Sequence, residues 1–464
     1  MENIDPLTNV DLIVYGGIVI TMDKERNIYD PGFIAINEGK IVSVGMGSPT
    51  NPSTRRVDAT GMVVLPGLVN SHDHLDQAIY RSCSDERPES RKRLLAMAKG
   101  LTYDRAKISS SLSLLELAHF GVTTTQENHW THYHSDSTDG VCDAITESGM
   151  RGMVSRGISD VELYTPKEFV ENIDEVLKDL DRLEKKYDSE FITITGEPTT
   201  VLRCKPDTIM AIKEWANRRD KIWHIHLAQT SDELADALKT LNMGSVDWAD
   251  QLGVLGPDTL AVHCSGLLEH EVDILGSRRV KIAHCPVTQM RGGNRVPPIW
   301  SLEEKGALVA IGTDGSGTNN GQNPWEAMKM AIYMQRIQTQ DRYLGSAEKA
   351  LEMVTIKAAA VLGIDHNVGS VENGKYGDLA LFSTNQLHLL PGAMFVNNLV
   401  YSSGCNFAST VIVGGEIILD NGLSTRVDEA EIRSKIVESQ RELLRNAELE
   451  DALRISHNWP INGI

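Results

Sequence analysis

The sequence lacks long apolar runs, closely spaced cysteines and an excess of positive charge. No window approaches the roughly 18 uninterrupted apolar residues that a membrane-spanning helix needs. The six cysteines are widely spaced, with no C-x-x-C pair and no pattern of a secreted disulfide framework. Lysine and arginine number 45 against 64 acidic residues, a net charge of −19, which argues against nucleic acid and anionic membrane surfaces as partners.

The N-terminal segment Met1–Pro6 is acidic and has no apolar core, so we expect no secretory signal peptide. Together with the cysteine pattern, this predicts a cytoplasmic protein with reduced thiols. The 464 residues are 41% hydrophobic, which is enough for a large core. The length predicts one large domain and a smaller one.

Apolar strands alternate with helix-like segments through the middle of the chain. Eight strands are expected, at 63–70, 121–126, 151–156, 191–196, 222–226, 260–263, 280–284 and 308–313. Helices are expected between them, at 108–120, 166–186, 206–218, 232–241 and 269–275, and after them at 323–338 and 347–362. Thr165 before Pro166 favours a helix start there. Eight alternations predict an α/β fold, a TIM-like (β/α)8 barrel. A doubly wound open sheet is the alternative, but no G-x-G-x-x-G follows a strand.

Segments rich in β-forming residues flank this region on both sides. They are 12–15, 18–21, 33–36 and 41–44 before it, with turns at 16–17 and 37–40, and 377–382 and 409–413 after it, with a hairpin turn at 414–415. We predict three parts: a small β-sandwich domain from residues 1–60 and 369–425, a barrel from 61–368, and a charged C-terminal helix and tail from 426–464.

Histidines gather at the carboxyl ends of the predicted barrel strands. They are His72 and His74 after the first strand, His224 and His226 on the fifth, His263 on the sixth and His284 on the seventh, with Asp314 after the eighth. Strand ends of a barrel meet at one mouth. A single strand-end histidine is ordinarily a hydrogen-bonded core residue. Six of them with an aspartate predict a metal site that has a carboxylate on its open side.

The motifs around these residues carry a family resemblance. They are PGLVNSHDH at 66–74, HLAQ at 226–229, VHC at 262–264, AHCP at 283–286 and GTDG at 312–315. They resemble the amidohydrolase superfamily, and within it the branch of aminoheterocycle deaminases and triazine hydrolases. The resemblance covers nearly the whole chain, and it implies a metal-dependent hydrolase.

The resemblance implies one divalent metal per chain, zinc first, with iron or manganese as the alternatives. Its ligands would be His72, His74, His226 and Asp314. Asp314 would also take the proton from the attacking water, and His263 would polarise the atom under attack. His284 would contact substrate, whereas His224 has no role in the pattern and is expected to be structural. No lysine ends the fourth strand, so we expect no second, bridged metal.

Gln229 departs from the deaminase pattern, which has a glutamate there that shuttles a proton to the leaving ammonia. A carboxamide donates a hydrogen bond but transfers no proton near neutral pH. Either another group is the acid, or the leaving group, such as a halide, needs none. We count Gln229 among the catalytic residues with Asp314 and His263.

Three further residues are candidates for substrate contact. Glu127 and His129 follow the second strand, and Glu197 ends the fourth. Polar residues at strand ends also occur for solubility alone. The three are therefore predicted as substrate-binding residues on position only.

Three functions remain open from the sequence. The first is displacement of an amino or other leaving group from a nitrogen heterocycle by metal-activated water. The second is hydrolysis of a cyclic amide or another C–N bond at the same site. The third is a non-catalytic scaffold. The presence of all four candidate metal ligands argues against it. The partner is expected to be a small-molecule substrate, and the resemblance implies a homodimer or larger homo-oligomer.

Overall fold

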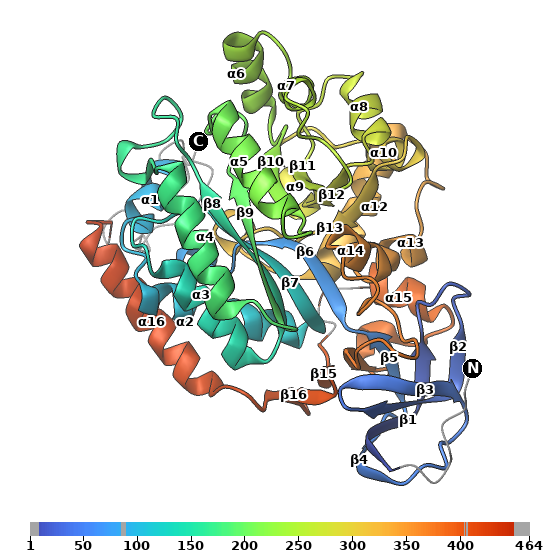
Figure 1. Ribbon diagram of the computed structural model, residues 1–464. Coiled ribbons are helices and arrows are strands. Elements are labelled where there is room, and N and C mark those ends of the chain that lie inside the picture. The colour runs from blue at the N-terminus through green and yellow to red at the C-terminus, as the bar shows by residue number, and fades with distance from the viewer. Residues whose placement is uncertain (1–8, 85–89, 403, 405–406, 450–464) are drawn as a thin grey trace, which may run out of the picture.

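The computed structural model describes residues 9–84, 90–402, 404 and 407–449. Figure 1 shows an α/β unit, with its helices around the outside, beside a sheet built from both ends of the described chain. The predicted α/β class is confirmed. None of the helices in these residues is long and apolar enough to cross a membrane.

Eight parallel strands of the α/β unit form two four-stranded sheets. The first holds β6 (Leu68–Asp73), β7 (Val122–His129), β8 (Arg151–Ile158) and β9 (Ile192–Pro198). The second holds β10 (Trp223–Leu227), β11 (Thr259–His263), β12 (Lys281–His284) and β13 (Leu308–Ile311). Thr200 and His226 form a parallel bridge at one seam between the sheets. At the other seam, Asp314 N donates to the His72 carbonyl at 3.1 Å.

Helices follow the strands in the predicted alternation. They are α1 (Ser90–Ala98), α2 (Tyr103–His119), α3 (Ser137–Ser148), α4 (Ile173–Tyr187), α5 (Pro206–Asn217), α6 (Ser231–Leu241), α7 (Ser245–Gln251), α8 (Glu271–Ser277), α9 (Pro286–Arg291), α10 (Ile299–Glu304), α11 (Ser316–Asn319), α12 (Pro324–Thr339), α13 (Ala347–Glu352) and α14 (Ile356–Val361). Three 3-10 turns accompany them, η1 (Leu75–Tyr80), η2 (Lys167–Phe169) and η3 (Leu387–Leu389). The expected helix 347–362 is in fact two, α13 and α14, because the backbone at Thr355 is not helical.

The expected helix start at Pro166 is wrong. Only η2 follows Pro166, and α4 begins at Ile173, where the Asn172 side chain accepts a hydrogen bond from Asp174 N. The buried residues of α4 are Val176, Leu180, Leu183 and Tyr187. Their spacing of three and four residues begins only after Asn172, so the apolar stripe and the cap agree on the later start.

The expected strand 63–70 is also two strands. Residues Met62–Pro66 form β5, which pairs with strands from both ends of the chain, whereas β6 opens the α/β unit. Gly67 separates them at a close approach, because a Cβ there would lie 2.1 Å from Thr123 Oγ1. A single apolar run therefore serves two sheets.

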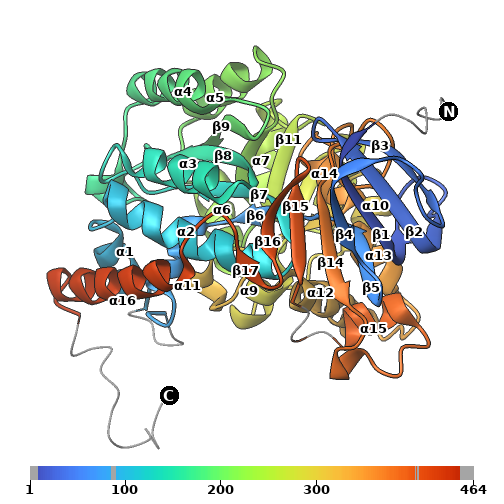
Figure 2. The same ribbon diagram turned by 90° about the horizontal axis from the view of Figure 1, so that it is seen from below.

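Strands from both ends of the chain form one mixed nine-stranded sheet (Figure 2). Its order is β17 (Leu423–Ser424), β16 (Glu416–Asp420), β15 (Thr410–Val413), β14 (Leu379–Ser383), β5, β1 (Val10–Ile20), β2 (Ile28–Asn37) and β3 (Lys40–Met46), with β4 (Ser53–Asp58) paired to β1. The predicted pairing of early and late β segments is confirmed.

The expected turn at Gly16-Gly17 is wrong. A single strand, β1, runs through both glycines, and its register against β2 shifts on either side of Gly17. Gly16 has a φ of +86°, which a glycine adopts without strain. The pair is thus a bulge within one strand, because both flanks bond to the same neighbour.

The chain ends, within the described residues, in α16 (Glu429–Asn446) and a short tail, while α15 (Phe395–Tyr401) precedes β15. Asp428 caps α16, and Ile432, Ile436 and Leu443 are buried. Figure 2 shows α16 beside α2. The five described cysteines are free thiols and buried, and Cys405 lies outside the described residues.

Candidate active site

Three imidazoles and one carboxylate meet at the carboxyl ends of three strands. The imidazoles of His72 and His74 come from the end of β6 and that of His226 from the end of β10, and the carboxylate of Asp314 follows β13. The ring of His72 lies with its centroid 4.9 Å from that of His74 and 5.1 Å from that of His226. Asp314 Oδ1 is 3.4 Å from His74 Nε2 and 3.8 Å from His72 Nε2. All four side chains are buried. The four predicted ligands thus share one small volume.

The outer nitrogen of each of these histidines is bonded to an oxygen that can only accept. The bonds run from His72 Nδ1 to Gln126 Oε1 (3.1 Å), from His74 Nδ1 to Asn128 O (2.6 Å) and from His226 Nδ1 to Glu197 Oε1 (2.8 Å). Each Nδ1 therefore carries the hydrogen, and each Nε2 turns a lone pair toward the centre. Burial alone would lower the pKa of His226, but the Glu197 carboxylate outweighs it and raises that pKa.

This donor set fits a divalent metal. Burial, followed by the neighbouring imidazoles, holds the pKa of His72 well below its ordinary value, so the ring is neutral. His72 Nε2 has no hydrogen-bond partner among the described residues. Three nitrogen lone pairs and one carboxylate oxygen facing each other repel unless a cation lies between them. Such a set is typical of catalytic zinc.

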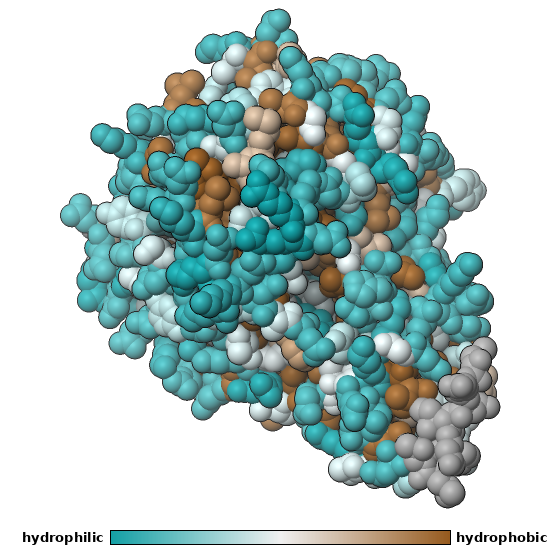
Figure 3. Space-filling model, in the orientation of Figure 1, coloured by the Kyte–Doolittle hydropathy of each residue, from teal (hydrophilic) through white to brown (hydrophobic). Residues whose placement is uncertain are grey.

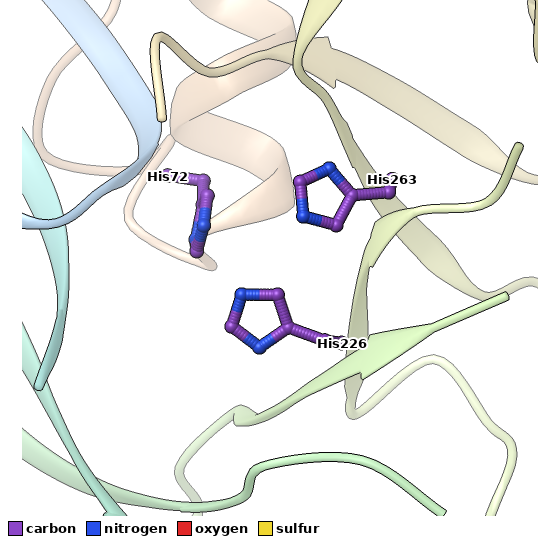
Figure 4. Close-up of side chains that lie close together, drawn as sticks. All are labelled: His72, His226 and His263. Atoms are coloured by element: carbon purple, nitrogen blue, oxygen red, sulfur yellow. The ribbon is translucent and has the colours of Figure 1, made fainter. Parts of the chain in front are cut away.

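His263 faces the same space from the end of β11 (Figure 4). Its ring centroid lies 5.3 Å from that of His226 and 5.8 Å from that of His72. Burial lowers the pKa of His263 to about 3, so it is neutral near pH 7. Gln229 Nε2 lies 3.2 Å from His263 Nε2, where its amide can donate to the ring. Gln229 and His263 therefore form a pair beside the ligands.

Several residues at this mouth have a left-handed backbone. Ala228, His263 and Asp314 have φ values of +49°, +80° and +60°. Side chains other than glycine rarely adopt this region, and such strain concentrates at functional sites. The three positions follow or end β10, β11 and β13, where the backbone must turn the site residues inward.

The other predicted site residues lie behind the centre. Glu197 supports His226 through its hydrogen bond. His284 is buried with neither ring nitrogen bonded among the described residues, and burial lowers its pKa to about 3. Glu127 and His129 are fully buried on β7, beside Asp76, and burial raises the pKa of Glu127 to about 7. None of these four lines the pocket described next, and their substrate contacts stay predictions.

His224 has a packing role. Its Nδ1 lies 2.6 Å from Ser155 Oγ, and burial lowers its pKa to about 3. It shares a strand with His226, two residues away, yet its ring contacts Ser155 on β8, a strand of the other four-stranded sheet, rather than the centre. Its geometry agrees with the structural role expected from the sequence.

A pocket of about 750 Å³ opens over the centre. Its lining includes the candidate ligands His74, His226 and Asp314 together with Gln229. The lining also contains two groups of charged residues. They are the arginines Arg91 and Arg203, beside Trp130, and the acidic residues Asp232, Glu233 and Asp236. Elsewhere, the face of the molecule in Figure 3 is mainly hydrophilic with scattered apolar residues. Sequence patterns had singled out neither the arginines nor the acidic group, since both come from loop and helix positions with no motif.

The supporting residues Gln126 and Asn128 were also missed. They lie on β7, 54 residues from the histidines that they orient. Alternation along the strand places both on one face. The bond from His74 uses the Asn128 carbonyl, however, and no side-chain pattern could have indicated it.

A comparison with models of protein families shows to which family this chain belongs. The model described as "Amidohydrolase family" matches residues 63–418. The chain belongs to the amidohydrolase family. The prediction of a metal-dependent, amidohydrolase-type hydrolase that acts on carbon–nitrogen bonds is thereby confirmed.

This amidohydrolase has curated relatives of nearly the same length. It is 30% identical over 441 residues to the 5-methylthioadenosine/S-adenosylhomocysteine deaminase of Pelotomaculum thermopropionicum, covering 94% of this chain and 98% of the relative. It is also 30% identical over 416 residues to the 5'-deoxyadenosine deaminase of Methanobrevibacter smithii, covering 89% and 94%.

Solved structures share the fold of the amidohydrolase. An adenosine deaminase from Xanthomonas campestris with bound zinc superposes with a TM-score of 0.88 at 22% identity, over 95% of this chain and all of that one. A variant of the atrazine chlorohydrolase TrzN from Arthrobacter aurescens, complexed with zinc and atraton, gives 0.87 at 23%, over 92% and all of it. At this level of identity the likeness shows the fold.

Proposed function

We propose that this protein is a metal-dependent deaminase of adenine nucleosides that releases ammonia from the 6-amino position. The observation that carries the proposal is the set of converging acceptor atoms at the floor of an open pocket. Relatives that share 30% identity over about nine-tenths of the chain are named as deaminases of such nucleosides, which supports it.

The metal would be one divalent ion in this site, zinc first, held by His72, His74, His226 and Asp314. When bound, it supplies a Lewis acid that makes water nucleophilic near neutral pH. The residues present fit it, because every ligand atom is an acceptor without a hydrogen to offer.

Each residue of the chain then has a defined task. Asp314 accepts the proton of the attacking water at a carboxylate oxygen, and His263 holds the heterocycle at the atom under attack. Gln229 orients substrate through its amide, since it transfers no proton. Glu233 holds Gln229 in place by accepting a hydrogen bond from its backbone N at 2.9 Å. Asp314 and His263 must therefore carry the proton to the leaving ammonia.

The charged pocket wall favours a substrate with an anionic group. Burial, followed by the neighbouring Arg91, lowers the pKa of Arg203 to about 10, and its guanidinium lies 6.0 Å from the Trp130 ring centroid. Arg203 makes no ion pair within the described residues. A carboxylate would satisfy it. S-adenosylhomocysteine carries one, whereas 5'-deoxyadenosine does not, so we infer a preference for the former.

The test is ammonia release by metal-replete protein from both nucleosides. We expect turnover of both, with a higher kcat/KM for S-adenosylhomocysteine. Arg203→Met should lower kcat/KM for that substrate by about tenfold to a hundredfold, as expected for a lost charged hydrogen bond. The same variant should leave 5'-deoxyadenosine unaffected. If neither nucleoside releases ammonia with zinc, iron or manganese bound, the proposal is refuted.

Metal content provides a second check. His226→Ala should lose the metal of this site, because one of its nitrogen ligands is gone. His224→Ala, two residues away on the same strand, should keep it. Elemental analysis of both variants decides, and equal contents would contradict the assigned ligand.

Gln229 favours a second candidate function, the displacement of a group that leaves without an acid. Hydrolysis of a halogenated heterocycle at the same site would suit an amide at that position, because a halide leaves without a proton. Hydrolysis of a cyclic amide at this site is the other alternative. Chloride release or ring opening without ammonia from any nucleoside would establish it. A protein inert toward all these substrates would point to a non-catalytic scaffold.

We also infer the architecture that holds the site. The two parallel sheets make hydrogen bonds at both seams, which supports one TIM-like (β/α)8 barrel over residues 61–368. The mixed sheet, which has a bulge in β1, supports a β-sandwich domain from 1–60 and 369–425, with β5 of the adjoining segment added. The C-terminal part, 426–464, contains α16. The homodimer or larger homo-oligomer implied by the family stays a prediction, which sedimentation tests.

A further inference from the structure

A second group of acceptor atoms lies behind the candidate active site. It consists of Asp76 on η1 and Glu127 and His129 on β7, with side chains 1%, 0% and 0% exposed. His129 Nδ1 lies 3.7 Å from Glu127 Oε1 and 4.0 Å from Asp76 Oδ2. These separations are too long for direct hydrogen bonds. One atom from each residue lies within 4.8 Å of the other two.

A neighbouring serine fixes the orientation of the His129 hydrogen. Ser137 Oγ donates its only hydrogen to the His134 carbonyl at 2.9 Å, and it lies 2.8 Å from His129 Nε2. The hydroxyl oxygen must therefore accept from His129, so Nε2 carries the hydrogen. In the neutral ring, Nδ1 then turns a lone pair toward the two carboxylates.

The cluster has no partner that would neutralise it among the described residues. Both Asp76 oxygens, Glu127 Oε1 and His129 Nδ1 lack a hydrogen bond. Arg156, the cation whose charge reaches His129, already binds Glu171 and Asp179. Buried acceptors that face one another in this way are strongly destabilising unless a cation or a proton lies between them.

We propose that Asp76, Glu127 and His129 bind a second divalent metal, separate from the catalytic one. Two carboxylates and an imidazole form a donor set that suits manganese or zinc. The separations of 3.7 and 4.0 Å are compatible with ligand atoms arranged around one ion.

This second ion would position His74. Asp76 lies two residues beyond His74, and the other oxygen of Glu127 accepts from Leu75 N at 2.6 Å. The backbone carbonyl that orients His74 belongs to Asn128, between the two β7 ligands. An ion in the cluster would therefore tie η1, which directly follows that histidine, to β7.

The test counts metal in variants of the full chain. His226→Ala, which should empty the catalytic site, is expected to retain one equivalent of manganese or zinc after dialysis. Adding Asp76→Asn and Glu127→Gln to it should remove that equivalent, because the amides keep the shape but lose both charges. A metal content of zero in His226→Ala would overturn the proposal.

Crystals of the wild-type protein soaked in manganese provide a measurement that does not depend on the variants. We expect an anomalous peak between Asp76, Glu127 and His129. A water molecule or protonated carboxyl groups there, with no anomalous signal, would overturn the second site. That outcome would not change the expected release of ammonia. Conversely, a failure to release ammonia would not change the expected anomalous peak, so the two proposals are tested separately.

Discussion

At the scale of single residues, Gln229 is the position on which the proposed chemistry depends most. Its amide contacts His263, and its backbone is held by Glu233. A neutral amide suits a neutral imidazole, because it can donate to the ring nitrogen. In the proposed reaction the pair therefore binds and orients substrate, and its proton transfer is limited to what His263 provides.

Gln229→Glu should raise ammonia release from adenine nucleosides. The new carboxyl has an ordinary pKa of about 4.3 and supplies an acid to the leaving amine. General acid assistance is worth about 10²–10⁴-fold, so steady-state rates measure the gain easily. A halogenated heterocycle serves as the control substrate, because its leaving group needs no acid. Equal rates of both proteins on both substrates would show that Gln229 takes no part.

At the scale of elements, α3 and α4 are joined by one aspartate. Asp139 of α3 accepts hydrogen bonds from Arg182, Lys186 and Tyr187 of α4 at 2.7–3.0 Å. Burial alone would raise the pKa of Asp139, but the bonds from Arg182 and Lys186 outweigh it and lower it to about 2. The carboxylate thus binds the two helices more strongly than its protonated form does.

This contribution to stability depends on pH. Because the folded pKa lies below the ordinary value of 3.8, the stabilisation is fully present above about pH 4 and is lost as the pH falls toward 2. Asp139→Asn should lower Tm at pH 7, and its difference from wild type should shrink between pH 4 and 2. Glu175→Gln, on the exposed face of α4, is the control. A difference in Tm that is constant over this range would contradict the assignment.

At the scale of the whole molecule, an ion pair joins the α/β unit to the mixed sheet. Arg151 of β8 binds Asp378, just before β14, through two bonds of 2.7 and 3.2 Å. Asp378 also accepts from Gly414 N, and the Arg151 guanidinium lies 4.0 Å from the Tyr376 ring centroid. Both partners are buried. The contact fixes how the two parts of the chain meet.

Arg151→Met should lower the free energy of unfolding by about 3–5 kcal/mol, because it leaves a buried carboxylate without its partner. Adding Asp378→Asn should recover part of that loss. Arg151→Lys keeps the charge but not the two-bond geometry, and it should fall between wild type and Arg151→Met. Urea denaturation measures all four proteins. Unchanged stability of Arg151→Met would show that the parts are held together by apolar packing alone.

The sequence by itself determined the alternation of strands and helices, the pairing of both ends and the gathering of histidines at strand ends. The strand and helix pattern and the positions of the histidines are local features. Apolar residues repeating every second position indicate a strand, and those repeating every three to four positions indicate a helix. A polar residue at the carboxyl end of a strand lies at the edge of the sheet where such ends meet. His72, His74 and His226 were therefore recognisable as candidate ligands before any fold was known.

Only the tertiary structure decided which partners these residues have. Gln126 and Asn128 orient histidines that lie 54 residues away, and Glu127 and His129 on the same strand point to a buried cluster with Asp76 instead of the pocket. Alternation along a strand gives the two faces of β7, but it does not say what packs on each. That depends on long-range packing, as do the split at Gly67 and the pocket wall at Arg203, because each is set by contacts between segments far apart in the chain.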